Sequence, residues 1–138
     1  MKLHPFTAVL IPIALTCATA ASAQDQPFAT PDRNGDYFSN YAPIQAKTPS
    51  NSPGSLWQVV SPGLHCRSEA GRQFSIVRSF KIGTILQANI GRGGSDEVLI
   101  NGRDHQGKPW MSVRSEAGEN YACSVRSNSR YIKPYKGR

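Results

Sequence analysis

The second half of the chain alternates short apolar runs with turn residues. Leu86, Ala88 and Ile90 alternate with Gln87 and Asn89, which is the pattern of a half-buried strand. No segment repeats apolar residues at helical spacing over three turns. Strands are predicted over residues 56–61, 64–67, 74–80, 84–90, 97–101, 110–114 and 121–126. The predicted fold class is therefore all-β.

Turn-forming residues separate these predicted strands. Pro62-Gly63 and Asn101-Gly102 are two such sites, because proline and glycine favour turn geometry. Ala117-Gly118 is expected to join 110–114 to 121–126 as a hairpin. Strands at this close spacing are typical of a small barrel or a small sandwich, and the pattern is shared by both.

The first 23 residues have the arrangement of an export signal. Lys2 supplies a positive start, residues 6–15 an apolar centre, and Ala21-Ser22-Ala23 a small-residue cleavage site. The apolar centre is too short to span a hydrocarbon layer of about 30 Å, and no later stretch approaches the required length. We expect cleavage before Gln24, no transmembrane segment, and a periplasmic or secreted protein.

Residues 24–56 are rich in proline and small polar residues and lack apolar periodicity, so they predict a flexible, disordered tether. The folded domain is expected over residues 57–135. The prolines of the predicted tether are Pro27, Pro31, Pro43, Pro49 and Pro53. Four aromatic residues in the tether offer an alternative, docking on the domain or on a partner: Phe28, Tyr37, Phe38 and Tyr41.

Two cysteines fall on the apolar faces of predicted strands. Leu64 and Cys66 share one face of their strand, and Cys123 and Val125 share one face of theirs. We expect Cys17 to leave with the export signal, with a lipid anchor at Cys17 as the alternative. An even number of cysteines then remains in an oxidising compartment, and we predict a Cys66–Cys123 disulfide. Such a bond would stabilise the domain by about 4 kcal/mol. The alternative is two buried free thiols.

The formal net charge of +7 is concentrated on the predicted domain. Residues 57–138 hold thirteen basic and six acidic side chains, whereas residues 24–56 hold two basic and three acidic ones. A basic domain favours an anionic partner. The charge alone does not distinguish cell wall, lipid head groups, nucleic acid and acidic protein.

Basic and aromatic residues recur together near the ends of the predicted strands. Arginine binds carboxylates in a bidentate manner and stacks on aromatic rings, so these residues are candidates for a ligand-binding surface. The candidates are Arg67, Arg78, Trp110, Arg126 and Tyr131. The alternative interpretation is a solvated exterior with aromatic residues in the core.

Residues 64–88 read LHCRSEAGRQFSIVRSFKIGTILQA. The segment resembles the bacterial SH3-like (SH3b) domain, with its Leu-x-x-Arg-Ser stretch, glycine-containing loop, aliphatic strand and Lys-x-Gly-Thr turn. The matching positions are Leu64, Arg67, Ser68, Gly71, Ile76, Val77, Lys81, Gly83 and Thr84. Trp110-Met111-Ser112-Val113 and residues 125–132 resemble the second half of that domain more loosely, so the resemblance covers about residues 57–135.

The resemblance implies a small SH3-like β-barrel that acts as a non-catalytic module of exported bacterial proteins. Such modules often meet peptidoglycan or other envelope components. We therefore expect a binding module, with no catalytic residue, for a cell-wall polymer, a peptide or an envelope protein. We expect a monomer that needs no cofactor and binds no specific nucleic acid. A zinc site is not expected, because ligands at characteristic spacing are missing.

Two alternative functions remain open from the sequence. A small secreted basic ribonuclease would place His65 or His105 with Glu97, Glu116 or an arginine around a phosphate. The residue types permit this chemistry, but no motif fixes their separation. A partner-protein or inhibitor module is the other alternative.

Overall fold

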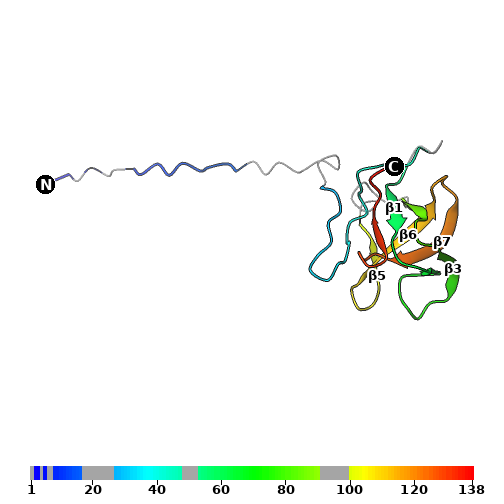
Figure 1. Cartoon of the computed structure of the whole chain (residues 1–138). Coiled ribbons are helices and arrows are strands. Elements are labelled where there is room, and N and C mark those ends of the chain that lie inside the picture. The colour runs from blue at the N-terminus through cyan, green and yellow to red at the C-terminus, as the bar shows by residue number, and fades with distance from the viewer. Residues whose placement is uncertain (1, 4, 6–7, 17–26, 48–52, 91–99) are drawn as a thin grey trace.

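The computed structural model describes residues 2–3, 5, 8–16, 27–47, 53–90 and 100–138. Every regular element among these residues is a β-strand, and they contain no helix (Figure 1). The predicted all-β class is confirmed. The strands are β1 (Leu56–Val59), β2 (Leu64–Arg67), β3 (Ile76–Phe80), β4 (Ile85–Ala88), β5 (Gly102–Arg103), β6 (Pro109–Ser115), β7 (Asn120–Arg126) and β8 (Ile132–Pro134).

The strands form one antiparallel sheet in the order β3-β2-β7-β6-β4-β1-β8, with β5 paired to β6. Among the described strands, β3 and β8 end this path and do not pair with each other, so the sheet is open. The predicted hairpin is confirmed, since β6 and β7 pair from Trp110↔Arg126 to Arg114↔Asn120. An SH3-like barrel arrangement remains a prediction.

The strand positions follow the apolar pattern, with ends shifted by a few residues. Six of the seven predicted strands appear as β1, β2, β3, β4, β6 and β7. Most of the seventh, 97–101, lies outside the described residues. The pattern missed β8, because Pro134 argues against a strand. Proline is tolerated there because β8 lies at an edge of the sheet, where a missing N–H breaks no ladder.

The inward faces of the strands form one hydrophobic core. Trp57, Leu86, Met111, Val125 and Ile132 are fully buried in it. Successive side chains of a strand point to opposite faces, so each strand that supplies these core residues also presents a second, outward set.

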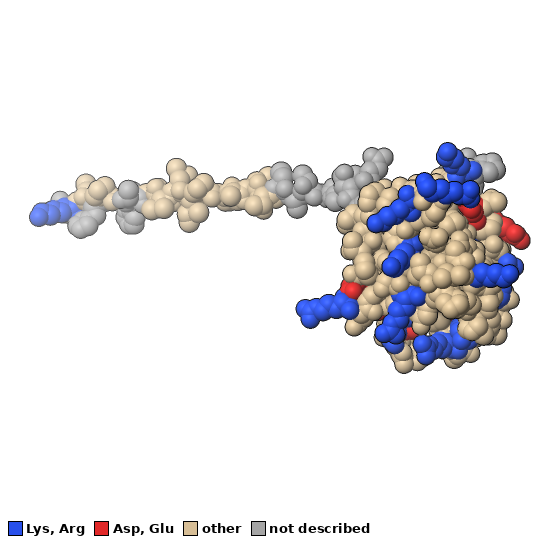
Figure 2. All heavy atoms as spheres, in the orientation of Figure 1, with Lys and Arg blue, Asp and Glu red and all other residues tan. Residues whose placement is uncertain are grey.

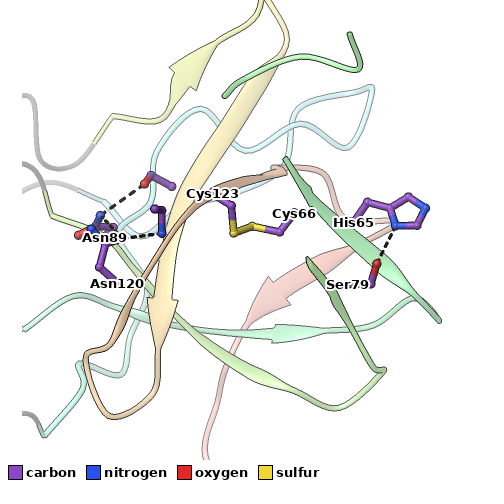
Figure 3. The surroundings of a disulfide bond; sticks show 8 residues. His65, Cys66, Ser79, Asn89, Asn120 and Cys123 are labelled. Carbon is purple, nitrogen blue, oxygen red and sulfur yellow. Dashed lines mark hydrogen bonds between the residues drawn. A yellow bond between two sulfur atoms is a disulfide. The ribbon is translucent and has the colours of Figure 1, made fainter. Parts of the chain in front are cut away.

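A disulfide joins Cys66 of β2 to Cys123 of β7, with their Cα atoms 5.4 Å apart (Figure 3). Both cysteines are buried in the core. The register between β2 and β7 contains the single residue pair Arg67↔Ser124, so the covalent bond reinforces a short strand contact. The predicted disulfide is confirmed, and the alternative of two free thiols does not hold.

Residues 27–47 pack against the sheet, as in the docking alternative and unlike the flexible tether predicted over 24–56. Tyr37 is 3% exposed and meets Trp57 edge to face, and Ala42 is fully buried. The backbone N–H of Tyr37 donates to the carbonyl of Ser127 at 2.9 Å. Composition missed this segment because a few apolar side chains anchor it without any periodic pattern. Residues 24–26 and 48–52 lie outside the described part.

Only parts of the predicted export signal belong to the described residues. The described residues among the first sixteen are exposed and belong to no strand, and the expected cleavage site at Ala23 lies outside the described residues. Within the described residues, no helix has the length and apolar character needed to cross a membrane.

The disulfide gives a first prediction. Replacing both sulfurs, with Cys66→Ala and Cys123→Ala together, should lower the free energy of unfolding by up to about 4 kcal/mol, because the unfolded chain regains the entropy of an open loop. Urea unfolding followed by circular dichroism measures this loss, and reduction of the wild-type chain is the control. An unchanged unfolding midpoint in both cases would contradict it.

Docking of the N-terminal segment gives a second prediction. Tyr37→Ala should destabilise the fold by about 3 kcal/mol, because it leaves a cavity beside Trp57. Phe28→Ala is the matched control, since Phe28 belongs to the same segment but is 49% exposed, and it should cost about 1 kcal/mol or less. Equal effects of the two substitutions in urea unfolding would show that the segment does not dock as described.

Candidate ligand-binding cleft

The outward face of β2, β7 and β6 carries polar and basic side chains. Paired residues of an antiparallel ladder point to the same side, so Arg67 shares this face with Ser124, and Arg126 shares it with Trp110. The disulfide lies on the opposite face. Figure 3 shows Cys66 directed toward Cys123 and His65, its neighbour on β2, directed away from the disulfide.

A cavity of about 290 Å³ opens on this outward face. Four of the five predicted ligand-binding residues line it, namely Arg67, Trp110, Arg126 and Tyr131. The strands β2, β6 and β7 supply the first three, and the turn before β8 supplies Tyr131. The cavity also has contributions from His65, Arg72 and the β1–β2 connection at residues 61–63.

Two further cavities, of about 220 and 450 Å³, share Arg72 and Arg126 with the first. We call this group of three cavities the basic cleft. Its basic lining residues are Arg67, Arg72, Lys108, Arg126 and Arg130, and its acidic ones are Asp36 and Asp104. Figure 2 shows the same imbalance over one face of the molecule, where Lys and Arg are frequent and carboxylates are few.

Arg67 is held at the cleft by a single hydrogen bond from its guanidinium. Its Nη1 donates to the carbonyl of Phe74 at 2.8 Å, and the residue is half-buried. A guanidinium carries five N–H donors, so this bond fixes the group while further donors stay available to an anionic ligand. Arg72, in the loop between β2 and β3, is exposed and adds a second positive charge to the same cavity.

Arg126 lines all three cavities of the cleft and also anchors the N-terminal segment. Its Nη2 lies 2.5 Å from Oδ1 of Asp36, and its Nη1 donates to the carbonyl of Pro109 at 3.0 Å. Asn128 donates to the same Asp36 oxygen at 2.8 Å. The Arg126 side chain is 16% exposed and that of Asp36 is 7% exposed, so this ion pair is largely buried. The main role of Arg126 is therefore to hold the N-terminal segment in place through Asp36.

Trp110 is fixed by a carboxylate on the neighbouring loop. Its indole Nε1 donates to Oδ2 of Asp104 at 2.9 Å, while Oδ1 accepts from the backbone N–H groups of Gln106 and Lys108. Burial alone would raise the pKa of Asp104, but these hydrogen bonds and the charge of Arg126 outweigh it and lower that pKa. The carboxylate is thus ionised at neutral pH and orients the indole.

Arg78, the fifth predicted residue, lines none of the three cavities of the cleft. Its guanidinium stacks on the ring of Tyr121, 4.0 Å from the ring centroid. Sequence reasoning also missed Arg72 and Lys108, which enter the cleft from loops. Loop residues carry no periodic signal, and their approach to the strands depends on how each turn folds back.

The two histidines considered for phosphate chemistry line different parts of the cleft. His65 lines the first cavity and shares a 2.9 Å hydrogen bond with the Ser79 hydroxyl (Figure 3). His105 lines the second cavity, where it lies 3.5 Å from Gln73. In the described part of the chain, no three His, Cys, Asp or Glu side chains gather as a metal site. The arrangement suits binding of an anion between guanidinium groups and aromatic rings.

Comparisons of this chain with protein-family models, with curated proteins and with solved structures find no match.

The lowered pKa of Asp104 gives a third prediction. A carboxylate with a depressed folded-state pKa stabilises the fold above its unfolded pKa of about 3.9, and this contribution is lost as the pH falls through the folded pKa. The wild type should therefore lose more stability between pH 5 and pH 3 than Asp104→Asn, which does not titrate at this position. Urea midpoints measured across that range test this, and parallel curves for the two proteins would contradict it.

Proposed function

We propose that this chain is an exported, non-catalytic binding module whose basic cleft recognises anionic groups of the cell envelope. Carboxylate-bearing peptides of the bacterial cell wall are the leading ligand class. The observation that carries the proposal is the convergence of Arg67, Arg72, Trp110 and Tyr131 on one cavity. The resemblance of residues 57–135 to the bacterial SH3-like domain supports the same class of ligand.

Recognition rests on charge and on aromatic contact area. Arg67 and Arg72 donate charge-assisted, bidentate hydrogen bonds to a carboxylate, while the half-buried Tyr131 covers the apolar part of the ligand and Trp110, 4% exposed, supports the cavity wall. Asp36 neutralises much of the charge of Arg126, so the two other arginines provide most of the attraction in this cavity. Exposed charges are screened within about 10 Å at 0.1 M salt, so binding weakens as salt rises.

An extracytoplasmic location accords with the covalent chemistry of the fold. Disulfides persist in oxidising compartments and are rare in the reducing cytosol, and this chain holds one in its core. Export by a cleavable signal over residues 1–23 is part of the proposal. A binding module outside the cytosol meets wall polymers directly, and the basic surface favours their acidic groups.

Retention on purified cell wall tests the proposed function. The oxidised chain should sediment with insoluble peptidoglycan at low salt and be released as salt is raised. Arg67→Ala and Arg72→Ala should each weaken retention about ten-fold, because a charge-assisted hydrogen bond contributes about 1.5–3 kcal/mol. Arg33→Ala is the matched control, since it removes one positive charge from an exposed turn outside the cleft and should bind normally.

The outcomes separate the functional classes. Equal retention of all three variants would rule out the cleft as a wall-binding site. Failure of the unsubstituted chain to bind the wall at low salt would rule it out as well. A protein complex that survives high salt would favour a partner or inhibitor module instead. RNA cleavage that disappears on His65→Ala or His105→Ala would replace the binding proposal with a ribonuclease.

A further inference from the structure

The strand β3 is an edge of the sheet and carries the cationic residue Arg78 at its centre. Among the described strands it pairs with β2 alone, from Leu64↔Phe80 to Arg67↔Ile76, with a shift of register between Cys66 and Arg67. An edge strand presents unpaired N–H and C=O groups that attract another strand. The opposite edge, β8, contains Pro134, which cannot donate a backbone hydrogen bond to an added strand. β3 contains neither proline nor glycine.

Apolar side chains are exposed on β3 and in the turn that follows it. Ile76 is 48% exposed and Val77 is 47% exposed, and Ile82 in the following turn is 63% exposed. Ile76 and Val77 lie where the register with β2 shifts, and a strand added at this edge covers part of each. The register with β2 already holds β3 extended, which reduces the ordering cost of pairing.

The sequence that contains β3 is rich in positive charge. No Asp or Glu occurs from Ala70 to Ile90, while Arg72, Arg78 and Lys81 fall within that range. Arg78 is exposed, and the central carbon of its guanidinium lies over the Tyr121 ring, 4.0 Å from the centroid. A guanidinium carries five N–H donors, so contact with an aromatic ring leaves donors for a carboxylate. The geometry thus fixes a cation beside an open strand edge.

We infer that β3 is a second binding site, separate from the basic cleft, at which an extended acidic peptide adds as an antiparallel strand. The peptide backbone pairs with β3, a glutamate or aspartate lies against Arg78, and flanking β-branched residues cover Ile76 and Val77. The partner is therefore an extended, acidic segment of another protein.

Charge disfavours a second copy of this chain at the same edge. Two β3 strands related by a two-fold axis at their centre place Arg78 opposite Arg78, and like charges directly opposite each other destabilise a strand pair. An acidic partner replaces this repulsion with a charge-assisted hydrogen bond.

Fluorescence anisotropy with a defined peptide tests the site. The probe is fluorescein-labelled Ser-Thr-Val-Glu-Val-Thr-Ser, which is symmetric about its glutamate and so presents the same side chains in either direction. It should bind the oxidised full chain, and Arg78→Glu should weaken binding at least about ten-fold by placing two negative charges together. Arg103→Glu is the matched control, because Arg103 stacks on Phe38 at 4.9 Å but lies on β5, and it should bind the probe normally.

Two altered probes identify the mode of binding. N-methylation of alternate residues removes the backbone donors needed for strand pairing and should abolish binding. Replacing glutamate by lysine should weaken binding at least about ten-fold. Equal binding of the N-methylated probe, no binding of the original probe, or equal loss with Arg78→Glu and Arg103→Glu would each overturn the inference. A dimer through β3, detected by sedimentation and broken by Val77→Lys, would overturn it in favour of a second copy.

Discussion

The Cys66–Cys123 disulfide is the interaction on which the rest of the structure depends. It joins β2 to β7, whose strand register contains one residue pair, Arg67↔Ser124. Because side chains alternate across a strand, fixing the sulfurs on the inward face also fixes Arg67 and Arg126 on the outward face. A core contact thereby positions the arginines of the basic cleft. Loss of the bond would loosen the cleft and the core together.

The N-terminal segment adds a second contact that holds the strands of the cleft. Asp36 of that segment forms a largely buried ion pair with Arg126 on β7, and this pair joins the segment to the basic cleft. Breaking a buried pair by removing one partner is costly, because it leaves an uncompensated charge. The folded unit therefore includes residues 27–47 and is larger than the domain over 57–135 that composition predicts.

The strands and the disulfide could be predicted from the alternation of apolar residues and from the chemistry of cysteine. Alternation at Leu64–Cys66 and around Cys123 predicts both strands and the face of each sulfur, because a strand has a strict period of two. Docking of Tyr37 and the entry of Arg72 into the cleft depend on tertiary packing of non-periodic segments, which no local pattern encodes. The placement of Arg78 on Tyr121, away from Arg67, likewise depends on the register between β2 and β3.

The account predicts that the disulfide and the cleft are coupled, and a residue-resolved titration tests this most directly. Soluble cell-wall peptides added to the isotopically labelled chain should shift NMR signals of Arg67, Arg72, the Trp110 indole and Tyr131. Reduction of the disulfide should weaken those shifts together while the free peptide is unchanged. Shifts that cluster elsewhere, or that persist unaltered after reduction, would contradict the account.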